Sequence, residues 1–298
     1  MRLPRRRMLA IALALLPAAS VQAQSTSSNP NVGNAIAREE EVHAGSLVGA
    51  PAPVGFESDL YCFGYVGGTD EPFVAEVTGA QDMTMQTDFT TRDLLYLNGG
   101  ADRGLKPGDE FWIVTPEHIV LNPASGKELG RFYKYRGRGV IHSIGGRSAI
   151  FEVLDACTDI PLGSFLKKFE PIPIPLSRKS PPAVAGDPPS GKPLGHIVEA
   201  RDGLVALGQD DDIIVDLGVA NRVEPGDFLT IFRYSTGREY GIEPQGSYWV
   251  STAPPPGVEV PRTYLGEVAI LTVGDRWAIG RIVDSYQMIL VGDQVEVK

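Results

Sequence analysis

The chain has 298 residues, of which 43% are hydrophobic and 21% charged, with 34 Gly, 24 Pro, 2 Cys and a net charge of −10. This composition excludes a collagen, a coiled coil, a disulfide-dense miniprotein and a fully disordered chain, because cysteine is scarce and the apolar content suffices for one or two cores. The acidic balance argues against nucleic acid as a partner, since a phosphate backbone needs clustered Lys and Arg.

The N-terminal segment has the pattern of a secretory signal peptide. Arg2 and Arg5–Arg7 precede an apolar run from Met8 to Leu16, and small residues then lead to Ala23. We expect cleavage near Ala23, which would remove four arginines, leave a mature chain of charge −14 and place it in the periplasm or outside the cell. The arginine cluster leaves a twin-arginine export route open beside the general one. No apolar run of the mature chain reaches the roughly 18 residues of a membrane span, so no transmembrane segment is expected there.

Composition divides the mature chain into four parts. Residues 24–54 are rich in Ser, Asn and Ala, which predicts a flexible leader. Residues 171–193 are rich in proline and predict an extended, semi-stiff linker. The linker separates two β-rich units, residues 55–170 and residues 194–298.

The two units repeat each other, which indicates an internal duplication. Residues 93–109 and 212–227 share an apolar run, a Gly turn and a Pro-Gly-Asp turn. Further on, the matched positions at a constant offset of 129 are Ala149 and Ala278, Asp155 and Asp284, and Gly163 and Gly292. Upstream, residues 64–66 match residues 195–197 at an offset of 131, so both triplets are expected to be the first strands of their units.

Each unit predicts short strands separated by turns. In the Pro-Gly-Asp turn, proline fixes φ and glycine takes the positive-φ position. Further strands are expected at 111–114, from 139 and at 149–154 in the first unit, and at 228–232, from 266 and at 278–283 in the second. Strands at this spacing are typical of small closed or half-open β-barrels. The second unit carries an insertion between Tyr234 and Tyr264.

The two cysteines fit this plan. Cys62 lies just before the expected first strand of the first unit, and Cys157 lies beside its last strands, which barrel closure makes neighbours. The equivalent positions of the second unit are Pro193 and Tyr286, so both cysteines are missing together. We predict a Cys62–Cys157 disulfide, with two buried free thiols as the alternative.

No pattern in the chain indicates an active site, and we expect no catalytic residues, no cofactor and no metal. The four histidines lie far apart, without metal-ligand spacing. Asp210–Asp212 offers the oxygen ligands that Ca²⁺ prefers, but a solvated turn before a strand is the favoured interpretation. Asp109 and Asp227 are expected to accept hydrogen bonds from the backbone of their turns.

One candidate partner surface is a segment that interleaves cations and aromatic residues. The candidate residues are Arg131, Tyr133, Lys134, Tyr135 and Arg136. On an extended strand Lys134 and Arg136 face one side and the two tyrosines the other, so a basic stripe suits an anionic polymer or protein. The alternative, which we favour, is a solvated strand edge protected by charge.

The insertion supplies a second candidate surface. Its Tyr248 and Trp249 form an aromatic pair that suits a protein partner or a sugar ring. A cap over an open barrel end is the alternative, and the sequence does not separate the two.

The repeated pattern resembles the small SH3-like barrels of bacterial envelope proteins, such as the C-terminal domain of flagellar assembly protein T and the twin barrels of rod-shape-determining protein C. The pattern consists of apolar strands, the turn from Gly104 to Asp109 or from Arg222 to Asp227, and a closing Ile-x-x-Gly segment. This resemblance implies an all-β fold of two duplicated SH3-like barrels and a non-catalytic assembly or scaffold role in the periplasm. Residues 223–229 also resemble the opening of LysM peptidoglycan-binding modules.

We therefore expect a non-enzymatic, exported structural or assembly protein of the bacterial cell envelope. Its expected partners are other envelope proteins, bound through barrel faces and loops. The alternative function is that of a peptidoglycan or other glycan-binding module.

Overall fold

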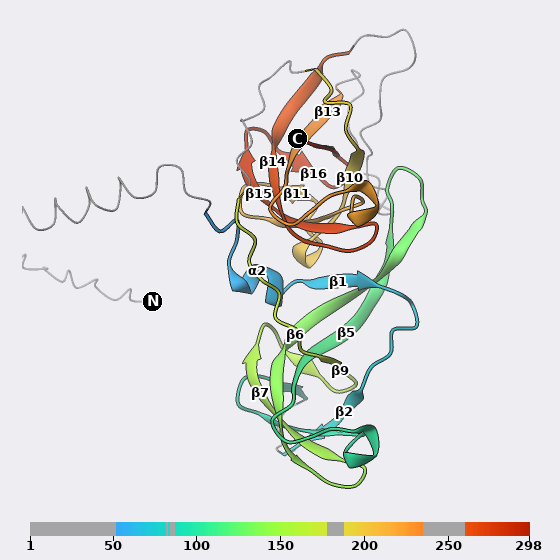
Figure 1. Ribbon diagram of the computed structural model, residues 1–298, viewed down its shortest axis with the longest axis vertical. Helices are drawn as coiled ribbons and strands as arrows, with labels where there is room; N and C mark the ends of the chain where they lie inside the picture. The colour runs from blue at the N-terminus through green and yellow to red at the C-terminus, as the bar shows by residue number, and fades with distance from the viewer. Residues whose placement is uncertain (1–51, 82, 84–86, 178–187, 235–259) are drawn as a thin grey trace, which may run out of the picture. The chain divides into compact units, whose positions relative to one another are not determined.

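The computed structural model describes residues 52–81, 83, 87–177, 188–234 and 260–298. All of them belong to one compact unit of the chain, residues 51–298. The fold is nearly all β and contains two small antiparallel barrels, as predicted (Figure 1). Each barrel has six strands. The expected signal peptide, residues 24–51 of the leader and the Tyr248-Trp249 pair lie outside the described residues. Within the described ranges no helix is long and apolar enough to cross a membrane.

The first barrel closes because its longest strand, β6, pairs with β5 on one edge and with β7 on the other. The order around the barrel is β6, β5, β9, β2, β4 and β7. The strands span Ala75–Ala80 (β2), Leu94–Leu97 (β4), Glu110–Leu121 (β5), Glu128–Ile144 (β6), Ala149–Ala156 (β7) and Phe165–Lys168 (β9). Two elements precede this barrel in the chain, the helix α2 (Glu57–Tyr61) and the strand β1 (Gly64–Gly67).

The second barrel has the same connectivity. Its order is β14, β13, β17, β10, β12 and β15. The strands span Leu194–Ala200 (β10), Asp212–Val215 (β12), Phe228–Tyr234 (β13), Arg262–Val273 (β14), Ala278–Ser285 (β15) and Gln294–Val297 (β17). Strand for strand, the two barrels therefore match, as an internal duplication requires.

The first strand of the first barrel is not the one predicted. The prediction placed it at residues 64–66, but these residues form β1, which pairs only with β6 and lies outside the ring of six. The equivalent of β10 is β2, because the pair Val77 and Leu97 in the first barrel corresponds to Ile197 and Val215 in the second. The third strands also begin earlier than predicted, at Glu128 and at Arg262, because each forms a long hairpin with the strand before it.

Turn chemistry follows the prediction. Gly108 and Gly226 have φ values of 88° and 90°, which glycine adopts without steric cost. The Oδ2 atoms of Asp109 and Asp227 each accept a hydrogen bond of 2.9 Å from a backbone N–H three residues earlier. Each repeat also has a small two-stranded sheet, formed by β3 (Asp88–Phe89) and β8 (Ile160–Pro161) in the first and by β11 (Ala206–Leu207) and β16 (Ile289–Leu290) in the second. The 3-10 turns Ala101–Arg103 and Val219–Asn221 are equivalent between the repeats, and a further 3-10 turn spans Arg201–Gly203.

The Cys62–Cys157 disulfide is present, as predicted. Its geometric reason differs from the predicted one. Because β5 occupies one edge of β6, both β1 and β7 pair along the other edge, β1 up to Lys134 and β7 from Gly137. The cysteines lie where these two strands meet, and the Cys157 N–H donates to the carbonyl oxygen of Arg136 at 2.9 Å. The bond therefore ties α2 and β1 to the barrel.

Each barrel has its own core, and a third apolar cluster joins them. Ile213 and Val215 belong to the core of the second barrel, whereas Ile214, between them on β12, is fully buried in a cluster that also contains residues from outside that barrel. We call this third group the inter-barrel cluster. Its buried members are Val54, Leu60, Phe63, Val66, Val120, Phe132, Val198, Ile214, Ala269, Leu271 and Ile279.

The described ends of the proline-rich linker form hydrogen bonds with other parts of the chain. Residues 52–54 lie antiparallel to residues 175–177, with the Val54 N–H donating to the carbonyl oxygen of Pro175 at 3.1 Å. At the other end, the Ser190 N–H donates to a carboxylate oxygen of Glu296 at 2.8 Å. These hydrogen bonds hold the described ends of the linker against the rest of the chain. The inter-barrel cluster provides a second connection between the barrels.

Candidate functional site

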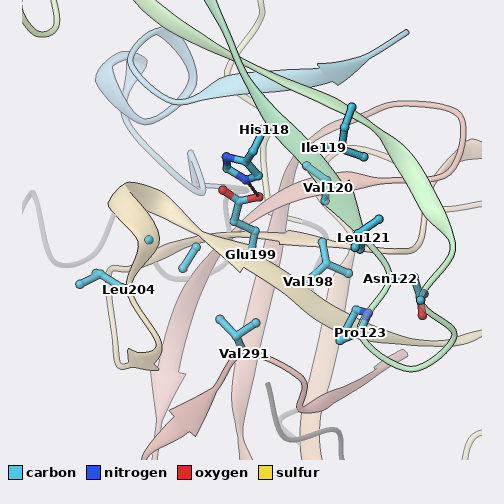
Figure 2. A pocket seen from close by; sticks show the side chains of 13 residues that line it. His118, Ile119, Val120, Leu121, Asn122, Pro123, Val198, Glu199, Leu204 and Val291 are labelled. Atoms are coloured by element: carbon cyan, nitrogen blue, oxygen red, sulfur yellow. Dashed lines mark hydrogen bonds and ion pairs between the residues drawn. The ribbon is translucent and has the colours of Figure 1, made fainter. Parts of the chain in front are cut away.

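An open groove of about 460 Å³ lies where the β5–β6 hairpin meets the second barrel. We call it the junction groove. Its lining residues are His118–Pro123 and Gly126 of the hairpin, Val198–Ala200 of β10, Gly203, Leu204 and Val291. Figure 2 shows the hairpin residues on one side and Val198, Glu199, Leu204 and Val291 on the other.

Two features of the strands produce this groove. Strand β9 pairs with β5 only as far as Val114, so residues 115–121 continue with β6 beyond the ring of six and reach β10. Strand β10 changes register between Ile197 and Glu199, and such a bulge re-aims the side chains around it. Val198 consequently belongs to the inter-barrel cluster, and Glu199 lines the groove.

The polar centre of the groove is a histidine–carboxylate pair. His118 Nε2 lies 3.0 Å from Glu199 Oε2, and the two side chains point toward each other in Figure 2. The Glu199 side chain is 17% exposed and that of His118 is 58% exposed. Burial raises the pKa of Glu199, and the hydrogen bond from His118 partly opposes that rise.

A second, charged hollow of about 220 Å³ adjoins the groove and shares His118, Glu199 and Gly203 with it. Two ion pairs lie along its walls. Lys134 Nζ is 2.7 Å from Asp202 Oδ1, and Arg136 Nη2 is 3.0 Å from Glu117 Oε1. The predicted cations Lys134 and Arg136 therefore line this hollow, each beside an acidic side chain of the same chain.

The predicted alternation along the segment 131–136 is confirmed. Tyr133 and Tyr135 are buried, whereas Lys134 and Arg136 remain partly exposed on the opposite face. Arg131 donates to the carbonyl oxygen of Glu117 at 2.5 Å. The favoured alternative of a solvated strand edge is wrong, because β5 pairs with this stretch on one side and β1 and β7 on the other.

The two tyrosines of that segment belong to an aromatic layer on the outside of the first barrel. Tyr135 stacks on Trp112 with ring centroids 4.5 Å apart, and Tyr133 stacks on Tyr65 at 5.2 Å. The Tyr133 hydroxyl donates to the carbonyl oxygen of Gly68 at 2.6 Å. Burial raises the pKa of both Tyr133 and Tyr135. These rings therefore act in packing.

The predicted solvated turn at the acidic run is wrong for Asp212, which is buried and shares Arg281 with Asp210. Asp211 Oδ2 accepts a hydrogen bond from the Gly208 N–H at 2.8 Å. Asp212 is 2% exposed, and its carboxylate lies 2.8 Å from Arg201 and 3.6 Å from Arg281. Burial raises the pKa of Asp212 to about 6, although both arginines oppose the shift. In the described part of the chain, no group of three or more His, Cys, Asp and Glu side chains is placed to hold a metal ion.

The same arginines connect the second barrel to α2. Arg201 Nη2 donates to the carbonyl oxygen of Asp59 at 2.9 Å, and Arg281 pairs with the Asp59 carboxylate. Asp59 is 3% exposed, so this contact is a buried ion pair. Charge-assisted contacts therefore link α2 to β15 and to Arg201 of the second barrel.

The junction groove itself was not predicted from the sequence. It depends on residues more than 70 positions apart, such as His118 and Glu199, and no local motif marks them. One signal for the contact between the barrels is present in the sequence. The run Ile213-Ile214-Val215 is apolar without alternation, which is typical of a strand buried on both faces.

No protein-family model matches this chain, and no curated protein sequence matches it either. The kind of ligand that the groove can bind is therefore inferred from the residues that line it. Its apolar walls are suited to bury apolar side chains of a ligand, and its buried carboxylate is suited to accept a hydrogen bond or a positive charge.

Proposed function

We propose that this protein is a non-enzymatic, exported structural or assembly protein of the bacterial cell envelope, and that it binds another protein in the junction groove. The observation that carries this proposal is the exposed apolar surface at the groove. Leu121, Leu204 and Val205 lie at or beside it with exposures of 54%, 46% and 48%. Exposed apolar side chains gathered around a concave site are typical of interaction surfaces.

Two further features support the envelope role. The disulfide is of the kind that persists in oxidising compartments such as the periplasm. The twin six-stranded barrels are in keeping with a relationship to the SH3-like barrels of envelope assembly proteins.

The alternative function, binding of peptidoglycan or another glycan, has less support. Stacking on a sugar ring needs an exposed aromatic face, and Tyr133 and Tyr135 are buried. Of the aromatic residues predicted for this role, Tyr248 and Trp249 remain as candidates, and they lie outside the described residues.

Site-specific photocrosslinking in the producing bacterium tests the proposal. A photoreactive residue at position 204 is expected to crosslink a discrete protein, whereas one at Val219, which is 57% exposed and does not line the groove, is not. Leu121→Glu should abolish the crosslink, because it places a charge in the apolar groove. Leu162→Glu, a matched change at a leucine 42% exposed outside the groove, should leave it intact. Equal crosslinking from both positions, or none from position 204, would overturn the proposal.

A further inference from the structure

We infer that the segment bound in the junction groove is extended and carries a Lys or Arg side chain between apolar side chains, with Glu199 contacting the cation. This inference rests on the proposed function, because it specifies which kind of protein segment the groove accepts.

Glu199 differs from the other acidic side chains in the two adjoining hollows. Glu117 is paired with Arg136, and Asp202 is paired with Lys134. Among the described residues, the partner of the Glu199 carboxylate is His118 alone, and an imidazole carries a charge only when it is protonated. The groove therefore contains one carboxylate without a permanent positive partner.

That carboxylate is also poorly hydrated. With 17% of its side chain exposed, Glu199 has lost most of its water, and nearby Glu117 adds repulsion. A buried ionised carboxylate is destabilised unless a cation or several hydrogen bonds replace the lost water. An ammonium or guanidinium group of a ligand would supply that replacement. The acidic charge of the whole chain, −10, favours the approach of a basic partner as well.

The remaining walls favour apolar side chains on either side of the cation. Ile119 and Leu121 line the groove from the hairpin, and Val198, Leu204 and Val291 line it from the second barrel. A volume of about 460 Å³ accommodates a few side chains rather than a folded domain. The occupant is therefore a short segment of a larger protein.

A free strand edge favours an extended conformation of this segment. Beyond Val114, β5 pairs with β6 at residues 115–116 and 119–121, with a register shift at Glu117 and His118. The described strands provide no partner on the other edge of residues 119–121. Residues 118–121 of this stretch line the groove. Main-chain hydrogen bonds to an unpaired edge, with side-chain pockets that give specificity, are the usual basis of strand addition.

Peptide selection tests the inference. A library of random twelve-residue peptides displayed on phage is selected on mature protein, and enriched peptides are synthesised with a fluorescent label for anisotropy titration. We expect enriched peptides to contain Lys or Arg flanked by apolar residues. Their affinity should fall about ten-fold or more with Glu199→Gln, which removes the charge and keeps the shape.

Two controls make the result specific to the groove. Glu152→Gln changes another glutamate that faces a histidine, His142 at 3.8 Å, on the first barrel outside the groove, and it should leave affinity unchanged. Replacing the peptide's Lys by norleucine needs no change in the protein and should cause a similar loss on wild-type protein. This second comparison stays informative even where Glu199→Gln disturbs folding.

The outcomes separate the inference from the proposed function. Peptides whose binding is lost with Leu121→Glu but not with Glu199→Gln or norleucine would overturn the inference and leave protein binding in the groove standing. Failure to select any peptide that depends on Leu121 would overturn both. Salt-resistant sedimentation with peptidoglycan sacculi that Glu199→Gln abolishes would also overturn both, in favour of a cell-wall ligand.

Discussion

The inter-barrel cluster predicts how two neighbouring residues of β12 contribute to the free energy of unfolding. Ile213 points into the core of the second barrel, and Ile214 points outward into the inter-barrel cluster; both are 0% exposed. Removing a buried isoleucine side chain down to alanine costs about 2–5 kcal/mol of unfolding free energy. Both Ile213→Ala and Ile214→Ala are therefore expected to fall in that range.

Comparing the two variants separates packing inside the second barrel from packing in the inter-barrel cluster. On an isolated second barrel Ile214 would face solvent, and truncation of an exposed side chain changes stability by only about 0.5 kcal/mol. Ile213 would remain buried in either case and serves as the control. Equilibrium urea unfolding followed by tryptophan fluorescence and circular dichroism gives both values. A loss of about 2 kcal/mol or more for Ile213→Ala, together with a loss of less than about 1 kcal/mol for Ile214→Ala, would refute the packing described here.

Three further predictions concern other parts of the fold. Replacing Cys62 and Cys157 together by serine should lower the unfolding free energy by about 4 kcal/mol, because the disulfide closes a loop with a sequence separation of 95 residues, and urea midpoints no different from wild type would contradict this. Gly218→Ala should cost about 2 kcal/mol in thermal or urea unfolding, because its Cβ would lie 2.5 and 2.6 Å from two backbone oxygens of the β14–β15 turn, whereas Gly68→Ala, with no atom within 4 Å, should be neutral. Burial raises the pKa of Asp212 from 3.8 to about 6, so the stability it contributes is complete below the lower value and is lost as the pH rises through the higher one. Wild type should thus lose stability relative to Asp212→Asn between pH about 4 and about 6 in urea titrations, and a constant difference across that range would show that the pKa is not raised.

The repeat and its turns were predictable because they depend on local chemistry. The Pro-Gly-Asp turns need a fixed φ, a positive φ and a side-chain acceptor at three consecutive positions, and three residue types supply them. The alternation of Tyr133, Lys134, Tyr135 and Arg136 needs only the two-residue period of a strand. The conformation of these turns and the facing of these side chains were therefore predictable from the sequence.

The first strand of the first barrel was mispredicted because a short match carries little register information. Residues 64–66 share a Gly-x-Val or Gly-x-Ile pattern with residues 195–197, and residues 75–77 share a nearly equivalent Ala-x-Val pattern with them. Which of the two segments completes the ring depends on pairing with β4 and β9, far away in the chain. The disulfide was nevertheless predicted, because both β1 and β7 lie on the same edge of β6.

The β class, the duplication and the turn geometry could be predicted from the amino-acid sequence, because each depends on local conformation or on a repeated pattern. The extension of β5 beyond its pairing with β9, the burial of Ile214 in the inter-barrel cluster and the pairing of His118 with Glu199 could be seen only in the folded molecule. These features come from the packing of surfaces distant in sequence. No local preference encodes such packing, since the same alternating strand can lie beside solvent or beside another barrel.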